Sequence, residues 1–530
     1  MLSARVPALR NQFIIGIGLF GFAVWIAWEV GGKIATEDLT SIAFATLLFA
    51  GCLVSVVILR NWRSGFYLFM VWLLFEDLVR KYLGNGTALF FGKDFLALLI
   101  YISLFVAIRR GKEKAFRPPF LLFLSLFIWL GAVQIFNQNS PSVFYGLLGF
   151  KLYFFYIPLI FVGYALIRDS EDLRKFLVAI AALTCVIASL GITQAILGHS
   201  FLNPTTLAPE LRDLGQLDKV TPISGQILSL PTSVFVSAGR YFLYLTMAEI
   251  IVIGAAGYLL LYTPRGRRIV FLAIGLIGAA ILLAGSRGGV LYGAASPIVL
   301  AAGFLWGAPW RMKQTHRMMK AIRRSLMFAT LGLAALLLFF PDEVKPRLAF
   351  YAETLLPSSS AYEVGSRTWD YPIQNLLSAL DSPHWMAGSG IGTASLGTQY
   401  VAKLLGERPP NIWVEEGYGQ LIVEMGIVAP ILWLLWTGAL LYYSWGVVRR
   451  LKQTRYFPVA FAIFWYAFLL LYPFTYGGLA PYQNFVNNAF LWLLIGILFR
   501  LPQLRVDSAS SDVLLNRSQI QRGLQFGGPA

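Results

Sequence analysis

The chain has 530 residues, of which 57% are hydrophobic and only 13% are charged, and its formal net charge is +17. A soluble protein of this length cannot hide so much apolar surface. The apolar residues fall in blocks of roughly 20, the length that a hydrocarbon layer about 30 Å thick requires. The composition therefore excludes a soluble protein and predicts an all-α polytopic membrane protein.

Apolar runs along the chain predict about fourteen transmembrane helices. They lie at 12–29, 40–59, 65–79, 94–108, 119–137, 144–167, 176–197, 239–262, 269–285, 289–306, 325–340, 416–446, 457–475 and 484–499. The first run lacks a small-residue cleavage site, so we expect a span there and not a cleavable signal. Cys52 and Cys185 lie inside apolar runs without ligand partners, which supports neither a disulfide nor a metal site.

The basic residues predict the orientation of these helices. With the N-terminus inside, the inner segments carry about two thirds of the 43 Lys and Arg residues, as the positive-inside rule expects. Residues 311–324 could form an anion or nucleic-acid patch, although a short cytoplasmic loop beside anionic lipid explains them better. We therefore expect both termini in the cytoplasm and no nucleic-acid partner.

Two long polar segments divide the chain. We expect helices 1 to 11 within residues 1–340, interrupted by the outer loop 198–238, then a large, partly helical outer loop at 341–414. The last three helices follow within 415–500, and residues 501–530 form a disordered cytoplasmic tail. Long structured loops are usually functional, so the chemistry should lie on the outer side.

Three arginines are predicted at this outer side. Arg287 stands in the turn SRGG (286–289) between two spans, where an arginine should face a cavity or an anion, because facing lipid is costly. The glycines behind it would let a backbone or a bulky ligand come close. Snorkelling to headgroups is the alternative for Arg287. Together with Arg240, at the foot of the eighth span, and Arg367, it could form a cationic pocket for a diphosphate.

An amphipathic helix is predicted directly after Arg367. Its apolar positions recur at helical spacing: Trp369, Ile373, Leu376, Leu377 and Leu380. This face should lie on the membrane surface or cap the helical bundle.

Carboxylates at the end of the large loop are the candidate acid or base. Glu416, Gln420 and Glu424 share one helical face, so a polar stripe enters the bilayer. Glu415 and Glu416 stand side by side, and their mutual repulsion would favour the protonated form of one, as general acid–base chemistry requires. The alternative is an ordinary acidic helix N-terminus stabilised by the helix dipole.

Neither a metal nor a cofactor is indicated by the remaining polar motifs. The glycine run GSGIG (388–392) could form a phosphate-binding nest, but it lacks the strand and helix context of a dinucleotide loop and favours a tight turn. No acidic cluster has the spacing of a Mg²⁺ or Ca²⁺ site. Arginines, and not a metal, should therefore hold a diphosphate.

The order of these motifs resembles the O-antigen ligase and Wzy-type polymerase family of bacterial envelope glycan enzymes. SRGG resembles that family's Ser-Arg-Gly turn, and residues 365–392 resemble its loop pattern of an arginine, an aromatic-rich helix, Asp-x-Pro and a glycine run. EEGYGQLIVEMG (415–426) is similar to the end of the loop, where Tyr418 and Gln420 match. FEDLVRKYLGNG (75–86) resembles a ligase-like subgroup. Glu415 stands where the family has its histidine, and Glu416 where it has an asparagine.

The resemblance implies a metal-independent glycosyltransferase in the bacterial inner membrane. It would transfer a glycan from a polyprenyl-diphosphate donor to a hydroxyl of a glycan or lipid-linked acceptor, polymerising or ligating O-antigen or exopolysaccharide. Arg287, Arg240 and Arg367, with Tyr418 and Gln420, would bind substrate, while Glu415 or Glu416 replaces the family's histidine as base. Partners could include a chain-length regulator or export proteins. A flippase of lipid-linked sugars is the alternative function.

Overall fold

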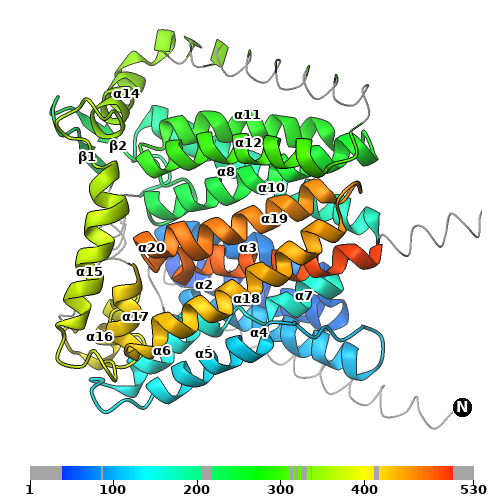
Figure 1. Ribbon diagram of the computed structural model, residues 1–530, viewed down its shortest axis with the longest axis vertical. Coiled ribbons are helices and arrows are strands. Elements are labelled where there is room, and N and C mark those ends of the chain that lie inside the picture. The colour runs from blue at the N-terminus through cyan, green and yellow to red at the C-terminus, as the bar shows by residue number, and fades with distance from the viewer. Residues whose placement is uncertain are drawn as a thin grey trace, which may run out of the picture. The chain divides into compact units, whose positions relative to one another are not determined.

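The computed structural model describes residues 39–84, 87–204, 217–310, 337–410 and 417–504, with single residues between 311 and 336 (Figure 1). Helices make up nearly all of its regular structure. The chain divides into two compact units, one of Met1–Arg110 with Pro204–Leu211, and one of Gly111–Asn203 with Arg212–Ala530.

The first unit contains α2 (Leu39–Arg60), α3 (Trp62–Leu83) and α4 (Thr87–Arg109), which pack on one another. Its helices carry buried charges in opposite pairs. Lys93 lies 2.9 Å from Glu76, and Arg80 lies 2.9 Å from Asp77. Such pairing is what allows charged side chains to remain inside apolar helices.

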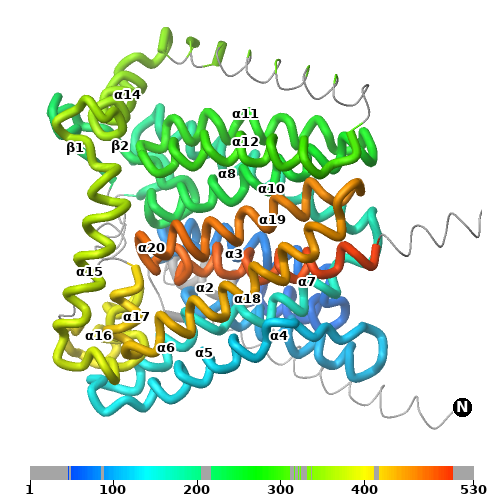
Figure 2. The backbone as a smooth tube through the Cα atoms, viewed as in Figure 1, coloured from blue at the N-terminus to red at the C-terminus, as the bar shows by residue number. Residues whose placement is uncertain are grey.

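The second unit is larger and contains a two-stranded hairpin. Its elements are α5 (Leu121–Gln134), α6 (Val143–Phe154), α7 (Leu159–Leu166), α8 (Ser170–Leu197), β1 (Asp218–Val220), β2 (Ile227–Ser229), α10 (Ala238–Tyr262), α11 (Arg267–Leu283), α12 (Arg287–Gly307), α14 (Pro341–Leu355), the π-helical turn η1 (Ser366–Asp370), α15 (Tyr371–Leu380), α16 (Thr398–Leu405), α17 (Gly417–Met425), α18 (Val428–Arg450), α19 (Phe457–Leu469), η2 (Leu470–Phe474), α20 (Thr475–Gly477), α21 (Ala480–Gln483) and a last helix, Phe485–Leu504. Figure 2 shows α14 to α17 and the β1–β2 hairpin gathered at one end of the long helices, with α15 running across that end.

Helix α10 is the centre of the second unit. It packs against α8, α11, α12 and α19, and most of its residues are buried. Helix α7 and the last helix approach each other closely at Gly163. A Cβ added there would lie 2.0 Å from the carbonyl oxygen of Leu493 in the last helix. A glycine is therefore required at that crossing.

Eight helices in the described part of the chain are long and apolar enough to cross a membrane. They are Leu89–Arg109, Val143–Leu166, Ser170–Leu197, Ala238–Tyr262, Arg287–Gly307, Val428–Arg450, Phe457–Gly477 and Phe485–Leu504. The chain is thus a multi-pass membrane protein, as expected from composition. The expected count of fourteen spans is wrong.

Several predicted spans differ because an apolar run does not reveal where a helix ends. The run 416–446 contains two helices, α17 and α18, separated at Gly426, whose φ of +83° is left-handed. The run 119–137 contains a helix of only 14 residues, α5. The run 65–79 belongs to α3, which is not one of the eight apolar helices because it carries buried charged residues. The run 12–29 and the tail lie outside the described residues.

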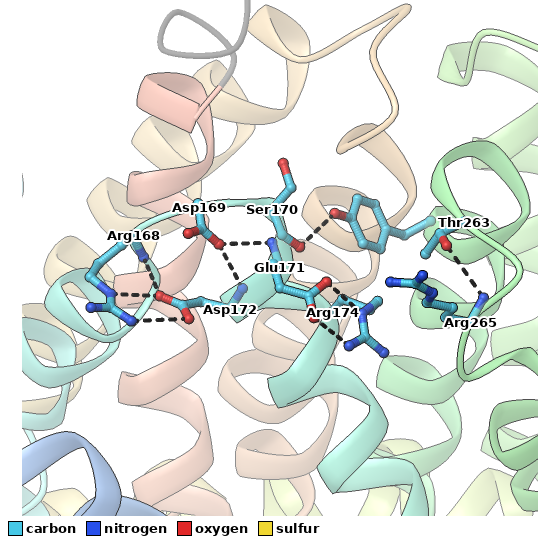
Figure 3. A network of polar contacts seen from close by, with 9 residues as sticks. Arg168, Asp169, Ser170, Glu171, Asp172, Arg174, Thr263 and Arg265 are labelled. Atoms are coloured by element: carbon cyan, nitrogen blue, oxygen red, sulfur yellow. Dashed lines mark hydrogen bonds and ion pairs between the residues drawn. The ribbon is translucent and has the colours of Figure 1, made fainter. Parts of the chain in front are cut away.

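A polar network lies at the start of α8 (Figure 3). Asp169 caps α8 by accepting from the backbone N–H groups of Glu171 and Asp172, and Arg168 donates to Asp172 at 2.8 Å. Ser170 is hydrogen-bonded to Tyr456, just before α19, at 2.7 Å. These contacts fix the start of α8 against neighbouring helices.

Candidate functional site

The β1–β2 hairpin is held against α14 by side chains of that helix. Glu353 accepts hydrogen bonds from the backbone N–H groups of Ile223 (2.8 Å) and Ser224 (3.1 Å) at the tip of the hairpin. A hydrogen bond from the Ser224 side chain, together with these two backbone bonds, lowers the pKa of Glu353. Arg347 is buried and donates to the carbonyl oxygens of Leu283 (2.8 Å) and Ser229 (2.6 Å). The hairpin, α14 and the end of α11 therefore form one layer.

A cationic cluster lies beside this layer. Arg287 Nη1 is 2.7 Å from Glu363 Oε2, and Arg367 Nε is 3.5 Å from the same oxygen. Lys219 of β1 is close enough to interact electrostatically with all three, and its Nζ lies 4.4 Å from the centre of the Phe350 ring. We call Lys219, Arg287, Glu363 and Arg367 the Glu363 cluster. It joins segments that are far apart in the sequence.

Local sequence explains how the two arginines are positioned. Arg287 is the first residue of α12, whose N-cap Ser286 accepts from the backbone N–H of Gly289. Gly285 has a φ of +66°, a conformation that favours glycine, and a Cβ there would lie 2.4 Å from the end of the Leu230 side chain, which follows β2. Arg367 follows Glu363 by one helical turn, the spacing at which opposite charges pair.

The cluster has an excess of positive charge. Three cations surround one carboxylate, which leaves a net charge of +2. Burial, together with the nearby charges of Arg287 and Arg367, lowers the pKa of Lys219, whereas Glu363 opposes this effect. The side chains of Arg287, Glu363 and Arg367 are 19%, 34% and 43% exposed, so a ligand can reach them. The site is suited to a dianion such as a diphosphate.

The third predicted arginine makes a different contact. Arg240 lies near the start of α10, half-buried, with its guanidinium 5.1 Å from the ring centre of Phe485. The glycines of the SRGG turn also have a specific neighbour, because a Cβ at Gly289 would lie 3.1 Å from the ring of Phe242. The space behind Arg287 is thus filled by Phe242 from α10.

Gln420 belongs to a buried network centred on Glu424. Glu424 is fully buried and accepts hydrogen bonds from the Tyr153 hydroxyl (2.9 Å), the Ser395 hydroxyl (2.7 Å) and the backbone N–H of Ala394 (3.0 Å). Gln420 Nε2 donates to the carbonyl oxygen of Ala394 at 3.1 Å. This network fixes α17 against the loop that precedes α16, a structural role for both side chains.

Of the other predicted site residues at the start of α17, the structure describes Tyr418 but not the two glutamates. Glu415 and Glu416 lie outside the described residues. Gly417, which follows them, packs so closely that a Cβ would lie 2.3 Å from the carbonyl oxygen of Tyr476. Tyr418 is half-buried, with its ring centre 6.1 Å from that of Tyr476. The start of α17 is therefore close to α20.

The amphipathic segment after Arg367 forms helix α15 and presents apolar residues on two sides. Leu376 and Leu380 pack with Ile422 and other residues of the α17 region, so this side caps the bundle. Trp369, Ile373 and Leu377 are 66%, 44% and 56% exposed and follow one another at four-residue spacing. The five positions therefore do not share one buried face, and contact of this exposed row with the membrane surface stays a prediction.

The glycine run GSGIG forms turns that pack on backbone. Gly388, Gly390 and Gly392 all have positive φ, and a Cβ at Gly392 would lie 2.0 Å from the carbonyl oxygen of Tyr145 in α6. The carbonyl oxygen of Gly388 accepts from Asn137 at 3.1 Å. The glycine run therefore forms tight turns, which was the favoured alternative, and not a phosphate-binding nest.

Sequence reasoning missed Lys219 and Glu363. The four-residue spacing of Glu363 and Arg367 was a visible signal for an ion pair. Lys219 had no such signal, because its proximity to Arg287 depends on a hairpin that is distant in sequence. Comparisons of this chain with protein families, curated proteins and solved structures found no match.

Proposed function

We propose that the protein is a membrane glycosyltransferase that polymerises or ligates polysaccharide from a polyprenyl-diphosphate-linked donor. The observation that carries this proposal is the convergence of Arg287, Arg367 and Lys219 on one carboxylate at the end of an apolar helical bundle. Such a site can hold a diphosphate while its lipid remains in the membrane. The resemblance to the O-antigen ligase and polymerase family points to the same chemistry.

The proposed reaction displaces the diphosphate directly from the anomeric carbon. An acceptor hydroxyl attacks that carbon, the glycosyl–oxygen bond to the diphosphate breaks, and the anomeric configuration inverts. Arg287, Arg367 and Lys219 stabilise the negative charge on the departing diphosphate. Glu415 or Glu416 accepts the hydroxyl proton. Arg240 and Tyr418 contribute to the binding of the remaining substrate.

The proposed location is the bacterial inner membrane, with the Glu363 cluster on its outer face and both termini in the cytoplasm. The excess of Lys and Arg in the segments expected inside supports this orientation. Reporter fusions at Ala361 and at Lys320 test it, since the two positions should report opposite sides of the membrane. The same answer at both positions would contradict it.

Purified full-length protein in lipid nanodiscs provides the test of activity. With a polyprenyl-diphosphate oligosaccharide as substrate, we expect longer or transferred glycan and released polyprenyl diphosphate. Movement of the intact lipid-linked glycan between leaflets of proteoliposomes, without any new glycosidic bond, would instead identify a flippase. In a deletion strain, the proposed enzyme predicts lipid-linked units accumulating outside, whereas a flippase predicts accumulation inside.

A further inference from the structure

A cavity of about 360 Å³ lies between the β1–β2 hairpin, the turn after α8 and the start of α14. This volume is in the range of small-molecule binding sites, about 300–1,000 Å³. Its wall includes the carboxylates of Asp218, Asp342 and Glu343 together with the apolar side chains of Ile227 and Pro346. The cavity is not part of the Glu363 cluster.

A chain of polar contacts runs along one wall. His199 Nδ1 lies 2.9 Å from the hydroxyl oxygen of Ser229, and His199 Nε2 lies 3.7 Å from Asp218 Oδ2. Asp218 and Ser229 are direct partners across the antiparallel hairpin, which places their side chains on the same face. His199 therefore bridges the two strands on that face.

The hairpin separates this wall from the cationic cluster. Neighbouring residues of a strand point to opposite faces, so Lys219 lies on the other face from Asp218. The cavity also has the opposite charge. Its three carboxylates are offset by the single guanidinium of Arg347, which leaves a net charge of −2 when His199 is neutral. An anionic group is thus attracted to one face of the hairpin and repelled from the other.

We propose that this cavity is a saccharide-binding subsite that takes a neutral or amino-bearing sugar of the glycan substrate. The carboxylates accept from sugar hydroxyl or ammonium groups, the hydroxyl of Ser229 both donates and accepts, and Ile227 and Pro346 contact the apolar side of the sugar ring. This ligand class rests on the proposed function, since it makes a glycan the substrate. The charge of the cavity excludes uronic acids and the diphosphate itself.

Divalent cations are the competing ligand for an acidic cavity. In the part of the chain that the structure describes, no three His, Cys, Asp or Glu side chains are placed to hold a metal ion. Glu343 is also engaged, because its Oε2 lies 2.9 Å from Arg347 Nη1. The geometry therefore favours hydrogen-bonded recognition of hydroxyl groups.

Saturation-transfer NMR on the full chain in lipid nanodiscs tests this subsite with methyl glucoside, glucosamine and glucuronic acid as probes. We expect saturable binding of the first two and none of the third. Asp342→Asn should weaken glucosamine binding about tenfold and methyl glucoside binding by a smaller factor. Ser200→Trp, which fills the cavity from an exposed position of its rim, should abolish both. Asp381→Asn, an exposed carboxylate outside the cavity, is the matched control and should change neither.

Three outcomes would overturn the subsite: no saccharide binds, glucuronic acid binds as well as methyl glucoside, or binding survives both cavity variants. Saturable Ca²⁺ binding that is lost in Asp342→Asn, without any sugar binding, would assign the cavity to a cation instead. Arg287→Lys should leave sugar binding intact. Sugar binding in a protein that transfers no glycan would therefore overturn the proposed reaction and leave the subsite standing.

Discussion

Glu363 places a carboxylate oxygen 2.7 Å from a guanidinium nitrogen of Arg287, so the candidate diphosphate site contains a counter-ion supplied by the protein itself. The same oxygen is 3.5 Å from Arg367. An incoming anion must compete with Glu363 for both arginines, which makes Glu363 a determinant of affinity and not only a structural residue.

The first prediction concerns this competition. Glu363→Gln removes the internal anion, and we expect the affinity for inorganic pyrophosphate to rise about three- to tenfold, because a partly exposed ion pair is worth on the order of 1 kcal/mol. Titration calorimetry on the purified full chain measures it. Glu407→Gln, an exposed position of the same residue type, is the control. A fall in affinity in Glu363→Gln would show that the carboxylate positions the arginines and does not compete with the ligand.

The second prediction concerns the planar fork of Arg287. Arg287→Lys keeps the positive charge but loses bidentate hydrogen bonding, so glycan transfer should fall on the order of a hundredfold with normal membrane insertion. Turnover of lipid-diphosphate glycan measures transfer. Arg408→Lys, in an exposed part of the large loop, is the matched control. Wild-type turnover in Arg287→Lys would reduce Arg287 to a lipid anchor.

The third prediction is a pH dependence that arises from Lys219. Its pKa is lowered in the free protein by burial and by Arg287 and Arg367. A bound anion favours the ammonium form and raises that pKa, so binding is coupled to proton uptake. Affinity for pyrophosphate should be highest below the pKa of the free protein and fall as the pH rises between the free and bound values.

Measurements at rising pH, up to the ordinary pKa of a lysine side chain, test this coupling. Lys219→Met should lower the affinity at the acidic end and flatten the profile, because the titrating group is gone. Lys345→Met, an exposed lysine of α14, should retain the wild-type slope. An unchanged slope in Lys219→Met would assign the titration to another group.

The fourth prediction concerns the two glutamates before α17. Glu415→Gln should abolish transfer, and Glu416→Gln should weaken transfer and shift its pH dependence, because adjacent carboxylates share their titration. Glu415→His, which restores the residue that the ligases have, should recover part of the activity. Turnover of purified variants across about pH 5 to 9 measures these effects. Full activity in the double Gln variant would falsify carboxylate base catalysis.

The fifth prediction concerns stability. Arg347→Leu removes the donors to the carbonyl oxygens of Leu283 and Ser229, and leaving such buried acceptors unpaired costs on the order of 3 kcal/mol. We expect a lower unfolding temperature and proteolysis within the β1–β2 hairpin. Arg408→Leu is the exposed control. A melting curve that matches the wild type would mean that water replaces the guanidinium.

The sequence by itself determined the class of the protein and the identity of several residues at the candidate site. Apolar runs predicted a helical membrane protein, because hydrocarbon tolerates only helices or closed barrels and each run is local in the chain. The same logic singled out Arg287, since an arginine between two spans is costly unless it faces a cavity or an anion. Arg367 was singled out by its place in the outer loop, just before an amphipathic helix. The helical spacing of the apolar residues likewise predicted the amphipathic helix after Arg367.

The tertiary structure decided which of these residues meet. Gln420 is buried against Ala394, and Arg240 packs on Phe485, whereas Lys219 and Glu363 join Arg287 and Arg367. Apart from the four-residue pair of Glu363 and Arg367, these outcomes depend on contacts between segments far apart in the chain, which hydropathy and local spacing do not encode. The number of spans depended on structure for a related reason: a continuous apolar run shows what is buried, but a left-handed glycine such as Gly426 decides where one helix stops and the next begins.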